Sequence, residues 1–221
     1  MRLGGKLPIR DRAAFEMETA WVESLASSTL VVPRVRRTTT GARVADVDGR
    51  PACVYSWVRG RRCRDRSRPK YAYELGEALA HLHAATVDFA APQNARVKDW
   101  DAARMCGYAL SGRAPGPELV AAVAKLGPTD WQLINADIGL HNTAWLAHVP
   151  GLYDFNDTGW GYTGFDIARF VFGLDDVTKG CALRGYASVA PLPDSYLEFG
   201  DAFETAAAQF LAAYRASKSR P

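Results

Sequence analysis

The 221-residue sequence lacks the features that mark several large classes of protein. No stretch approaches the roughly 20 consecutive apolar residues that a membrane-spanning helix needs. The opening residues, MRLGGKLPIR, contain no apolar core of the kind found in secretory signal peptides. We therefore expect no membrane partner and a cytoplasmic location.

Cysteine is scarce and scattered. The four cysteines, Cys53, Cys63, Cys106 and Cys181, form no Cys-x-x-Cys pair. In a cytosolic chain this distribution predicts free thiols rather than a disulfide framework. The spacing also argues against a structural zinc site.

Charge of one sign is not in large excess, because the formal net charge is only +3. One run, Arg59–Lys70 (RGRRCRDRSRPK), holds seven basic residues against one acid. It contains no aromatic residue on which a base could stack, so nucleic acid is not the expected partner. Residues 150–210 hold nine acids against three bases. For both regions, a solvated surface is the ordinary interpretation.

Helical and strand patterns follow one another along a chain without internal repeats. Asp11 is a plausible cap for the first helix, Asp48-Gly49 joins two β-like runs, and Leu75, Leu79 and Leu82 lie on one side of a helix that begins near Pro69. The predicted helices span residues 11–27, 69–86, 97–111, 117–126, 165–173 and 194–216, and the predicted strands are WQLI, TAWLA and GLYDF. This order suits a small mixed lobe joined to a mostly helical lobe, with a ligand cleft between them.

A polar loop, INADIGLHN, interrupts the apolar segments of the second half. Asp137 and Asn142 lie five positions apart in it, and Asp154 follows in LYDFND. Polar groups held this close to a core are costly unless something pairs with them. Oxygen ligands for Mg²⁺ and a carboxylate that orients a hydroxyl are what phosphoryl transfer requires. An ordinary turn rich in Asp and Asn is the alternative interpretation of the loop.

Three segments, NADIGLHN, YDFNDTGWG and GFDIARF, resemble in sequence and order the motifs of the aminoglycoside phosphotransferase and choline/homoserine kinase family, the small-molecule branch of the protein-kinase-like fold. The resemblance implies that Asp137 is the catalytic base and that Asn142 and Asp154 are magnesium ligands. It also implies that Asn135 and Asp166 brace the catalytic loop. Asn135 stands where the family has a histidine.

The resemblance continues upstream. FEMETAWVESLASSTLVVPRV looks like the family's first helix, which implies that Glu18 pairs with Arg2 near the nucleotide phosphates. CVYSWVRGR looks like the hinge, where the backbone of Ser56 and Val58 would bind adenine.

The implied fold is α+β, a protein-kinase-like two-lobe fold with a reduced N-terminal β lobe and a mostly helical C-terminal lobe. Residues 1–58 would form the partial N-terminal lobe, with strand 3, the first helix, a hairpin and the hinge. Residues 59–221 would form the C-terminal lobe with the catalytic loop.

The implied function is an ATP- and Mg²⁺-dependent phosphotransferase that moves the γ-phosphate to a hydroxyl of a small molecule, such as an aminoglycoside-like or a choline- or homoserine-like acceptor. The sequence departs from the family pattern at Asn135, Ala136 and Asn156, and it begins where the third strand is expected, without the glycine-rich loop. This leaves open an alternative: a truncated, weakly active or inactive kinase-like protein that binds nucleotide or a partner. The missing strands would also expose a sheet edge through which the chain could self-associate.

The remaining polar candidates have simpler interpretations. His81 and His83 lie two positions apart on a helix, which places them on different faces, so a packing or surface role is expected. His141 could touch a phosphate or stabilise the turn. Asp175 and Asp176 are expected to cap a helix, although contact with a cationic acceptor is the other interpretation.

Overall fold

The computed structural model of the chain describes residues 3–6, 11–26, 28–63, 69–93, 95, 97–127 and 130–218. The smaller part contains β1 (Leu3–Lys6), α1 (Arg12–Leu25), β2 (Val35–Arg36), β3 (Ala45–Val47) and β4 (Arg50–Ser56). The larger part contains β5 (Arg61–Arg62), α2 (Pro69–Thr86), β6 (Lys98–Asp99), α3 (Ala102–Met105), α4 (Tyr108–Ser111), α5 (Pro117–Leu126), β7 (Trp131–Ile134), the 3-10 turn η1 (Leu140–Asn142), β8 (Thr143–Leu146), β9 (Val149–Leu152), β10 (Gly159–Tyr162), α6 (Thr163–Val171), α7 (Asp176–Ala187) and α8 (Asp194–Lys218).

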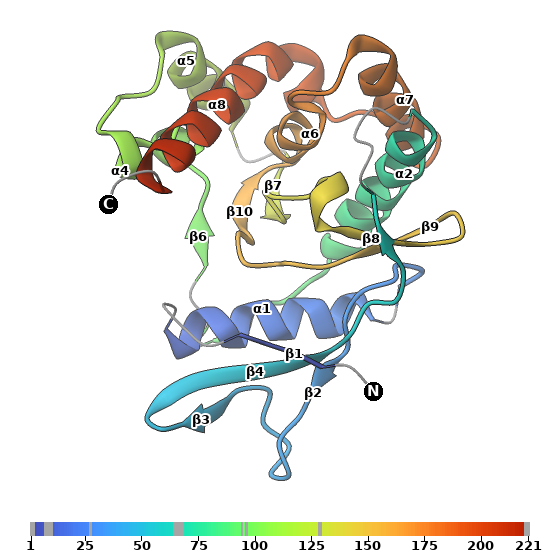
Figure 1. Cartoon of the computed structure of the whole chain (residues 1–221). Helices are drawn as coiled ribbons and strands as arrows, with labels where there is room; N and C mark the ends of the chain where they lie inside the picture. Colours follow the sequence, from blue (N-terminus) through green and yellow to red (C-terminus); the bar gives the residue numbers. More distant parts are fainter. Residues whose placement is uncertain are drawn as a thin grey trace.

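The smaller part is one helix above an antiparallel sheet. Strand β4 pairs with β1 and β2, and β3 pairs with β4 through the tight turn at Asp48-Gly49. Both turn residues have positive φ, 52° and 73°, which is the geometry of a two-residue hairpin turn. Asp11 caps α1 by accepting the Ala14 N–H at 2.8 Å. The predicted first helix and hairpin are therefore confirmed, and Figure 1 shows α1 running alongside β4.

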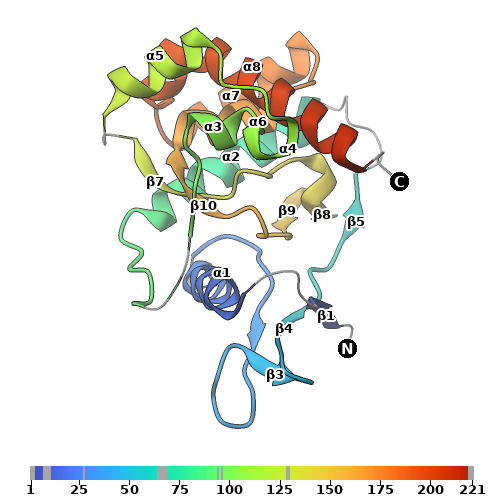
Figure 2. The same ribbon diagram turned by 90° about the vertical axis from the view of Figure 1, so that its left-hand side faces the viewer.

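The larger part is a group of helices that packs beside short strands. Helix α2 packs against α7, and α6 packs against α8, with Trp100, Phe165 and Phe203 in the core between the layers. Figure 2 shows these helices gathered on the side of the molecule away from β3 and β4. The α+β class and the arrangement of a small sheet-and-helix part beside a helical part agree with the prediction.

Two small sheets hold the polar loops. Strand β10 pairs with β6 and β7, and β8 pairs with β5 and β9. The loop 135–139 leaves β7, and Asn142 ends the 3-10 turn just before β8. The β8–β9 register sets Thr143 opposite Leu152, which brings the end of the polar loop beside the segment that carries Asp154.

One predicted helix is corrected, and the bounds of another are added. Residues 97–111, predicted as one helix, form β6 and two four-residue helices, because β6 pairs with β10 and Gly107 adopts a left-handed conformation (φ 72°) between the helices. The bounds of helix α7 were not predicted, although Asp175 and Asp176 were expected to cap a helix; Gly180 and Gly185 lower the helix propensity of this segment. Its start is capped by Asp175, which accepts the Thr178 N–H at 3.0 Å, as expected for that residue.

Two further properties concern the helices and the cysteines. No helix among the described residues has an apolar run long enough to cross a membrane. All four cysteines are within the described residues and none of them forms a disulfide.

Glycines make the α2–α7 crossing possible. A Cβ at Gly185 would lie inside contact distance of the Tyr73 carbonyl, and one at Gly76 would do the same at the Ala182 carbonyl. The two helix backbones therefore touch where each contributes a residue without a side chain. A Cβ added at Gly180, on the same helix α7, would meet only the flexible end of the Arg184 side chain, at 3.3 Å.

We expect Gly185→Ala to destabilise the protein by about 1–3 kcal/mol, because the added methyl group forces α2 and α7 apart. Gly180→Ala is the matched control, and it is expected to raise stability slightly, since alanine favours helix and the site has room. Urea unfolding followed by circular dichroism measures both. Equal effects of the two substitutions would contradict the close contact.

Candidate active site

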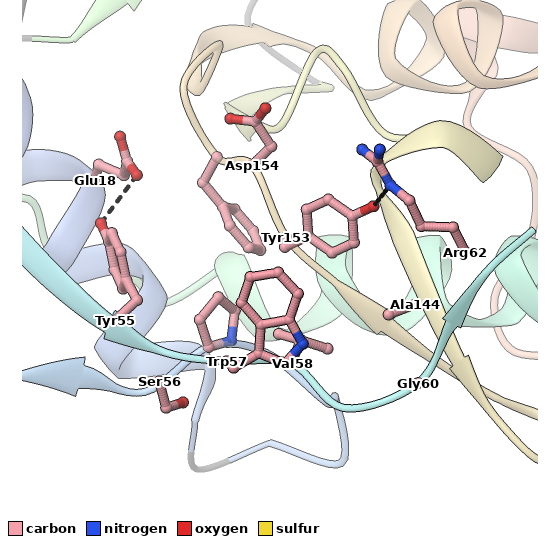
Figure 3. A pocket seen from close by; sticks show the side chains of 12 residues that line it. Glu18, Tyr55, Ser56, Trp57, Val58, Gly60, Arg62, Ala144, Tyr153 and Asp154 are labelled. Atoms are coloured by element: carbon pink, nitrogen blue, oxygen red, sulfur yellow. Dashed lines mark hydrogen bonds between the residues drawn. The ribbon is translucent and has the colours of Figure 1, made fainter. Parts of the chain in front are cut away.

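A cavity of about 440 Å³ lies between the end of β4, the start of β8 and the segment that follows β9. In Figure 3 the Tyr153 hydroxyl points to Arg62, and the Asp154 carboxylate points away from Trp57. The lining residues are mostly apolar and are Glu18, Pro33, Tyr55, Ser56, Trp57, Val58, Gly60, Arg62, Ala144, Tyr153, Asp154 and Phe155. A concave, largely apolar space with a few polar groups is the usual form of a small-molecule site.

A buried pair closes one side of the cavity. Tyr55 donates its hydroxyl to Glu18 at 2.9 Å, and both side chains are buried (Figure 3). Burial raises the pKa of the Tyr55 hydroxyl far above its usual value, and the Glu18 carboxylate raises it further, so Tyr55 stays protonated. Arg2, the partner expected for Glu18 from the sequence, lies outside the described residues.

The expected hinge residues line the same cavity. The Ser56 N–H donates to the Arg34 carbonyl at 2.8 Å, so this N–H is not available to a ligand. Val58 is buried at the wall, and Trp57 between them is 54% exposed, with its indole in the cavity opening (Figure 3). An exposed tryptophan beside backbone polar groups is suited to a planar base.

The loop after β7 is fixed by Asp166, on α6. The fully buried Asp166 carboxylate accepts the Asn135 N–H at 3.1 Å and the Ala136 N–H at 2.8 Å. Ala136 is buried with a positive φ of 59°, a conformation that an alanine keeps only where its surroundings hold it. This geometry is what a brace of the loop requires.

Two further buried side chains, His83 and Tyr186, continue the hydrogen bonding from Asp166. His83 Nε2 lies 3.1 Å from Asp166 Oδ2, and His83 Nδ1 lies 2.9 Å from the Tyr186 hydroxyl. Burial, with Asp166 as an added cause, raises the pKa of Tyr186, so its hydroxyl keeps its proton. We assign Tyr186 as donor to Nδ1 and the Nε2–H as donor to Asp166. His83 is thus buried, and it serves as a hydrogen-bond partner of Asp166, a role that goes beyond the packing or surface role expected from the sequence.

Asp137 is held at both carboxylate oxygens. Asn142 Nδ2 donates to Oδ2 at 2.7 Å, and Arg169 Nη2 donates to Oδ1 at 2.9 Å. The Asp137 N–H donates to Asn135 Oδ1 at 3.0 Å. The structure therefore brings Asn135, Asp137 and Asn142 into one hydrogen-bonded cluster, and a carboxylate remains partly accessible within it (28% exposed).

Asp154 follows β9 at the cavity wall with a positive φ of 66°. Asn156 donates to Asp154 Oδ1 at 2.6 Å. The Tyr153 N–H donates to the Asn142 carbonyl at 3.1 Å, which joins the backbone before Asp154 to the end of the polar loop. Asp157, a possible second charge at this turn, is instead bound by Lys98 at 2.7 Å.

The expected residues thus form two neighbouring groups. Glu18, Ser56, Val58 and Asp154 line the cavity, whereas Asn135, Asp137, Asn142 and Asp166 form the cluster beside it. The described residues contain no group of three or more His, Cys, Asp or Glu side chains that could hold a metal ion. A carboxylate from Asp154 and an amide oxygen from Asn142 nevertheless fit Mg²⁺, because this ion takes one or two protein oxygens and fills its shell with water and phosphate.

Four contacts at the site were not foreseen from the sequence. Glu18 is bound by Tyr55, and Asp166 is bound by His83. Asp137 is bound by Arg169, and Arg62 donates to the Tyr153 hydroxyl at 2.9 Å. Each partner lies at least 32 positions from the residue it contacts. The one available signal was the spacing of Asp166 and Arg169, since residues three apart on a helix lie on the same face.

The chain matches the phosphotransferase enzyme family over residues 6–215, and it belongs to that family. It is 31% identical over 193 residues to a homoserine kinase of Xanthobacter autotrophicus, covering 77% of this chain and 59% of that protein. It is 32% identical over 195 residues to a homoserine kinase of Brucella anthropi, covering 77% of this chain and 58% of the relative. The chain thus spans less than two thirds of the length of these curated relatives.

Solved structures show the same fold. An amicoumacin kinase in complex with AMP-PNP, Ca²⁺ and amicoumacin superposes with a TM-score of 0.80 at 16% identity, covering 99% of this chain and 75% of that one. A microcompartment-associated aminopropanol kinase superposes with a TM-score of 0.78 at 20% identity, covering 99% of this chain and 78% of the other. The protein-kinase-like fold expected from the sequence is confirmed.

We expect Asp166→Asn to lower the free energy of unfolding by about 1.5–3 kcal/mol, because an amide NH₂ group replaces one acceptor that faces a buried backbone N–H. Urea unfolding measures this loss, and hydrogen exchange at Ala136 should report a loosened loop. Asp176→Asn, at an exposed residue, is the control and should change stability little. Unchanged exchange at Ala136 in Asp166→Asn would contradict the brace.

Proposed function

We propose that this phosphotransferase family member transfers the γ-phosphate of ATP, with Mg²⁺, to a hydroxyl group of a small molecule. The observation that carries the proposal is the Asp137 carboxylate, held at 2.7 Å by Asn142 and at 2.9 Å by Arg169, beside a 440 Å³ cavity that contains Asp154. Phosphoryl transfer depends on positioned groups of this kind more than on covalent chemistry.

The proposed roles follow from position. The cavity would take the nucleotide, with the adenine beside Trp57, the Ser56 carbonyl and the Val58 backbone, and with Glu18 ordering the inner wall through Tyr55. Asp137 would accept the hydrogen bond of the acceptor hydroxyl and orient its oxygen for attack. Asn135 and Asp166 would keep the loop in the conformation that presents this carboxylate.

Asp154 and Asn142 would hold Mg²⁺. When bound, the ion neutralises developing charge on the phosphate oxygens. The chain's own contribution is to keep these two oxygens in place. Asp154 is fixed by the hydrogen bond from Asn156. Asn142 is fixed because its Nδ2 donates hydrogen bonds to the Asp137 carboxylate at 2.7 Å and to the Asp137 backbone carbonyl at 3.0 Å.

Homoserine is the acceptor we propose first, because the curated relatives at 30–32% identity carry the name homoserine kinase. Homoserine and aminopropanol are both small molecules with an amine and a hydroxyl. A relative is named for the first and a structural neighbour for the second, so we propose amino alcohols as the class of acceptor. Choline-like alcohols and aminoglycosides also contain a hydroxyl near a positive charge, and they form the second group to assay.

Nucleotide binding without transfer is the second candidate. One observation favours it: the residues that line the cavity include Asp154 and the hinge but not Asp137 or Asn142. Calorimetry with Mg-ATP, followed by assays of ATP hydrolysis and of phosphate transfer, separates the two candidates. Binding without turnover for any acceptor of the panel would favour this one.

We expect Asp137→Asn to lower the rate of transfer by at least about 10²-fold, because a positioned acid–base group contributes 10²–10⁴-fold. Nucleotide affinity should change little, because Asp137 is not among the residues that line the cavity. The melting temperature should fall, because the amide NH₂ group would face Arg169 or Asn142, each of which donates to the carboxylate. Asp99→Asn, at an exposed residue on β6, is the matched control. Unchanged transfer in Asp137→Asn would show that the assigned role is wrong.

We expect Trp57→Ala to weaken nucleotide binding by about 1–3 kcal/mol, the value typical of one base stacked on an aromatic ring. Trp57→Phe should retain most of the affinity, because a smaller ring remains. Calorimetry with Mg-ATP measures both variants. If Trp57→Ala binds as tightly as the natural chain, the base lies elsewhere in the cavity.

A further inference from the structure

We propose that Arg169 is a positioning residue of this active site: its guanidinium fixes both the backbone and the carboxylate of the base loop. The inference deepens the proposed function and rests on it, because positioning has a kinetic meaning only if Asp137 acts on an acceptor. Arg169 lies on α6, and it was not among the residues that the sequence motifs pointed to.

Arg169 makes two directed contacts with consecutive residues of the loop. Its Nε donates to the Ala136 carbonyl at 2.8 Å, and its Nη2 donates to Asp137 Oδ1 at 2.9 Å. The guanidinium is a rigid planar fork, so these two hydrogen bonds together set the orientation of the carboxylate relative to the backbone. The point charge of a lysine ammonium group could not fix the backbone carbonyl and the carboxylate in one defined orientation.

Side chains of helix α6 thereby hydrogen-bond both backbone polar groups of Ala136, the N–H and the carbonyl. Asp166 accepts the Ala136 N–H at 2.8 Å, and Arg169 donates to the Ala136 carbonyl at the same distance. The two side chains are three positions apart on α6, so one helix face supplies both contacts. The residue held in this way has a φ of 59° and immediately precedes Asp137.

The guanidinium is itself held in place. Its side chain is only 9% exposed, and its central carbon lies 4.7 Å from the ring centre of Phe210 on α8. Phe210 in turn packs edge-on against Trp100 in the core, with ring centres 5.4 Å apart. A cation over an aromatic face in a buried setting is stabilised, and its side chain has little freedom to move. The packing of Phe210 in the core therefore fixes the orientation of the Arg169 guanidinium, which in turn fixes the Asp137 carboxylate.

The carboxylate still has capacity for a substrate. Arg169 binds Oδ1 and Asn142 binds Oδ2, which uses one acceptor direction on each oxygen. A carboxylate has about four such directions, so an acceptor hydroxyl can still donate to it. His141 approaches the Oδ1 side, with Nε2 at 3.6 Å, but its side chain is half exposed and can move aside.

The test compares Arg169→Ala and Arg169→Lys with Arg104→Ala. Arg104 is a matched control, because its Nε also donates to a backbone carbonyl at 2.8 Å, that of Asp99, while no carboxylate of the loop is involved. We expect Arg169→Ala to lower kcat by about 10²-fold, the size of effect that misplacing a reacting group produces. The KM for the nucleotide should stay within about twofold, because Arg169 is not among the residues that line the cavity.

Two readouts separate positioning from a merely structural role. Arg169→Lys should recover only part of the loss, because lysine restores the charge but not the fork. Millimolar guanidinium chloride, added well below the concentration that unfolds the protein, should raise kcat of Arg169→Ala about tenfold by occupying the vacated site. It should do nothing for Asp137→Asn or Arg104→Ala. An unchanged kcat in Arg169→Ala, or a loss that guanidinium does not restore, would overturn the inference.

A separate measurement covers the case in which the natural chain transfers no phosphate to any acceptor, so that the proposed function itself fails. The carboxyl ¹³C signal of Asp137 is identified by its disappearance in Asp137→Asn. We expect Arg169→Ala to shift or broaden this signal, whereas Arg104→Ala leaves it unchanged. An Asp137 signal that is the same in Arg169→Ala and in the natural chain would overturn the positioning role without reference to turnover.

Discussion

The Asp166 carboxylate is the interaction on which the rest of the site depends. It is fully buried, and it accepts two consecutive backbone N–H groups of the loop together with a hydrogen bond from His83. A buried charge is tolerated only when it is paired and hydrogen-bonded, so removing any of these donors costs more than one ordinary hydrogen bond. The same carboxylate thus stabilises the helical part and holds Ala136 in a backbone conformation that alanine rarely adopts.

This arrangement places Asp137 in a frame set by rigid elements. Helix α6 contributes Asp166 and Arg169 from one face, α2 contributes His83, and α7 contributes Tyr186, which reaches His83 because α2 and α7 touch at glycines. The packing of three helices therefore converges on one short loop. Sites supported by packed helices hold a reacting group more firmly than sites on a free loop.

The sequence predicted the fold class, the first helix, the hairpin and the positions of Asp137, Asn142 and Asp154, because these are encoded in local patterns and in ordered motifs. The cap of helix α7 was foreseen but its bounds were not, since its glycines weaken the local signal and its stability comes from contact with α2. The division of residues 97–111 depends on the pairing of β6 with β10, which local periodicity does not encode. Arg169 was hidden for a similar reason: its partners lie 32 and 33 positions away. Local sequence therefore pointed to the candidate residues of the site, and tertiary contacts supplied the groups that hold them.

The cavity and the loop are joined by one short polar path. Arg62 donates to the Tyr153 hydroxyl at 2.9 Å, and that hydroxyl donates to the His141 carbonyl at 3.0 Å. Tyr153 also donates its N–H to the Asn142 carbonyl, and it precedes Asp154 directly. A ligand that packs against Tyr153 in the cavity would therefore press on a residue bound to the 3-10 turn at two backbone carbonyls. Tyr153 therefore connects the wall of the cavity to the turn that places Asn142 beside Asp137.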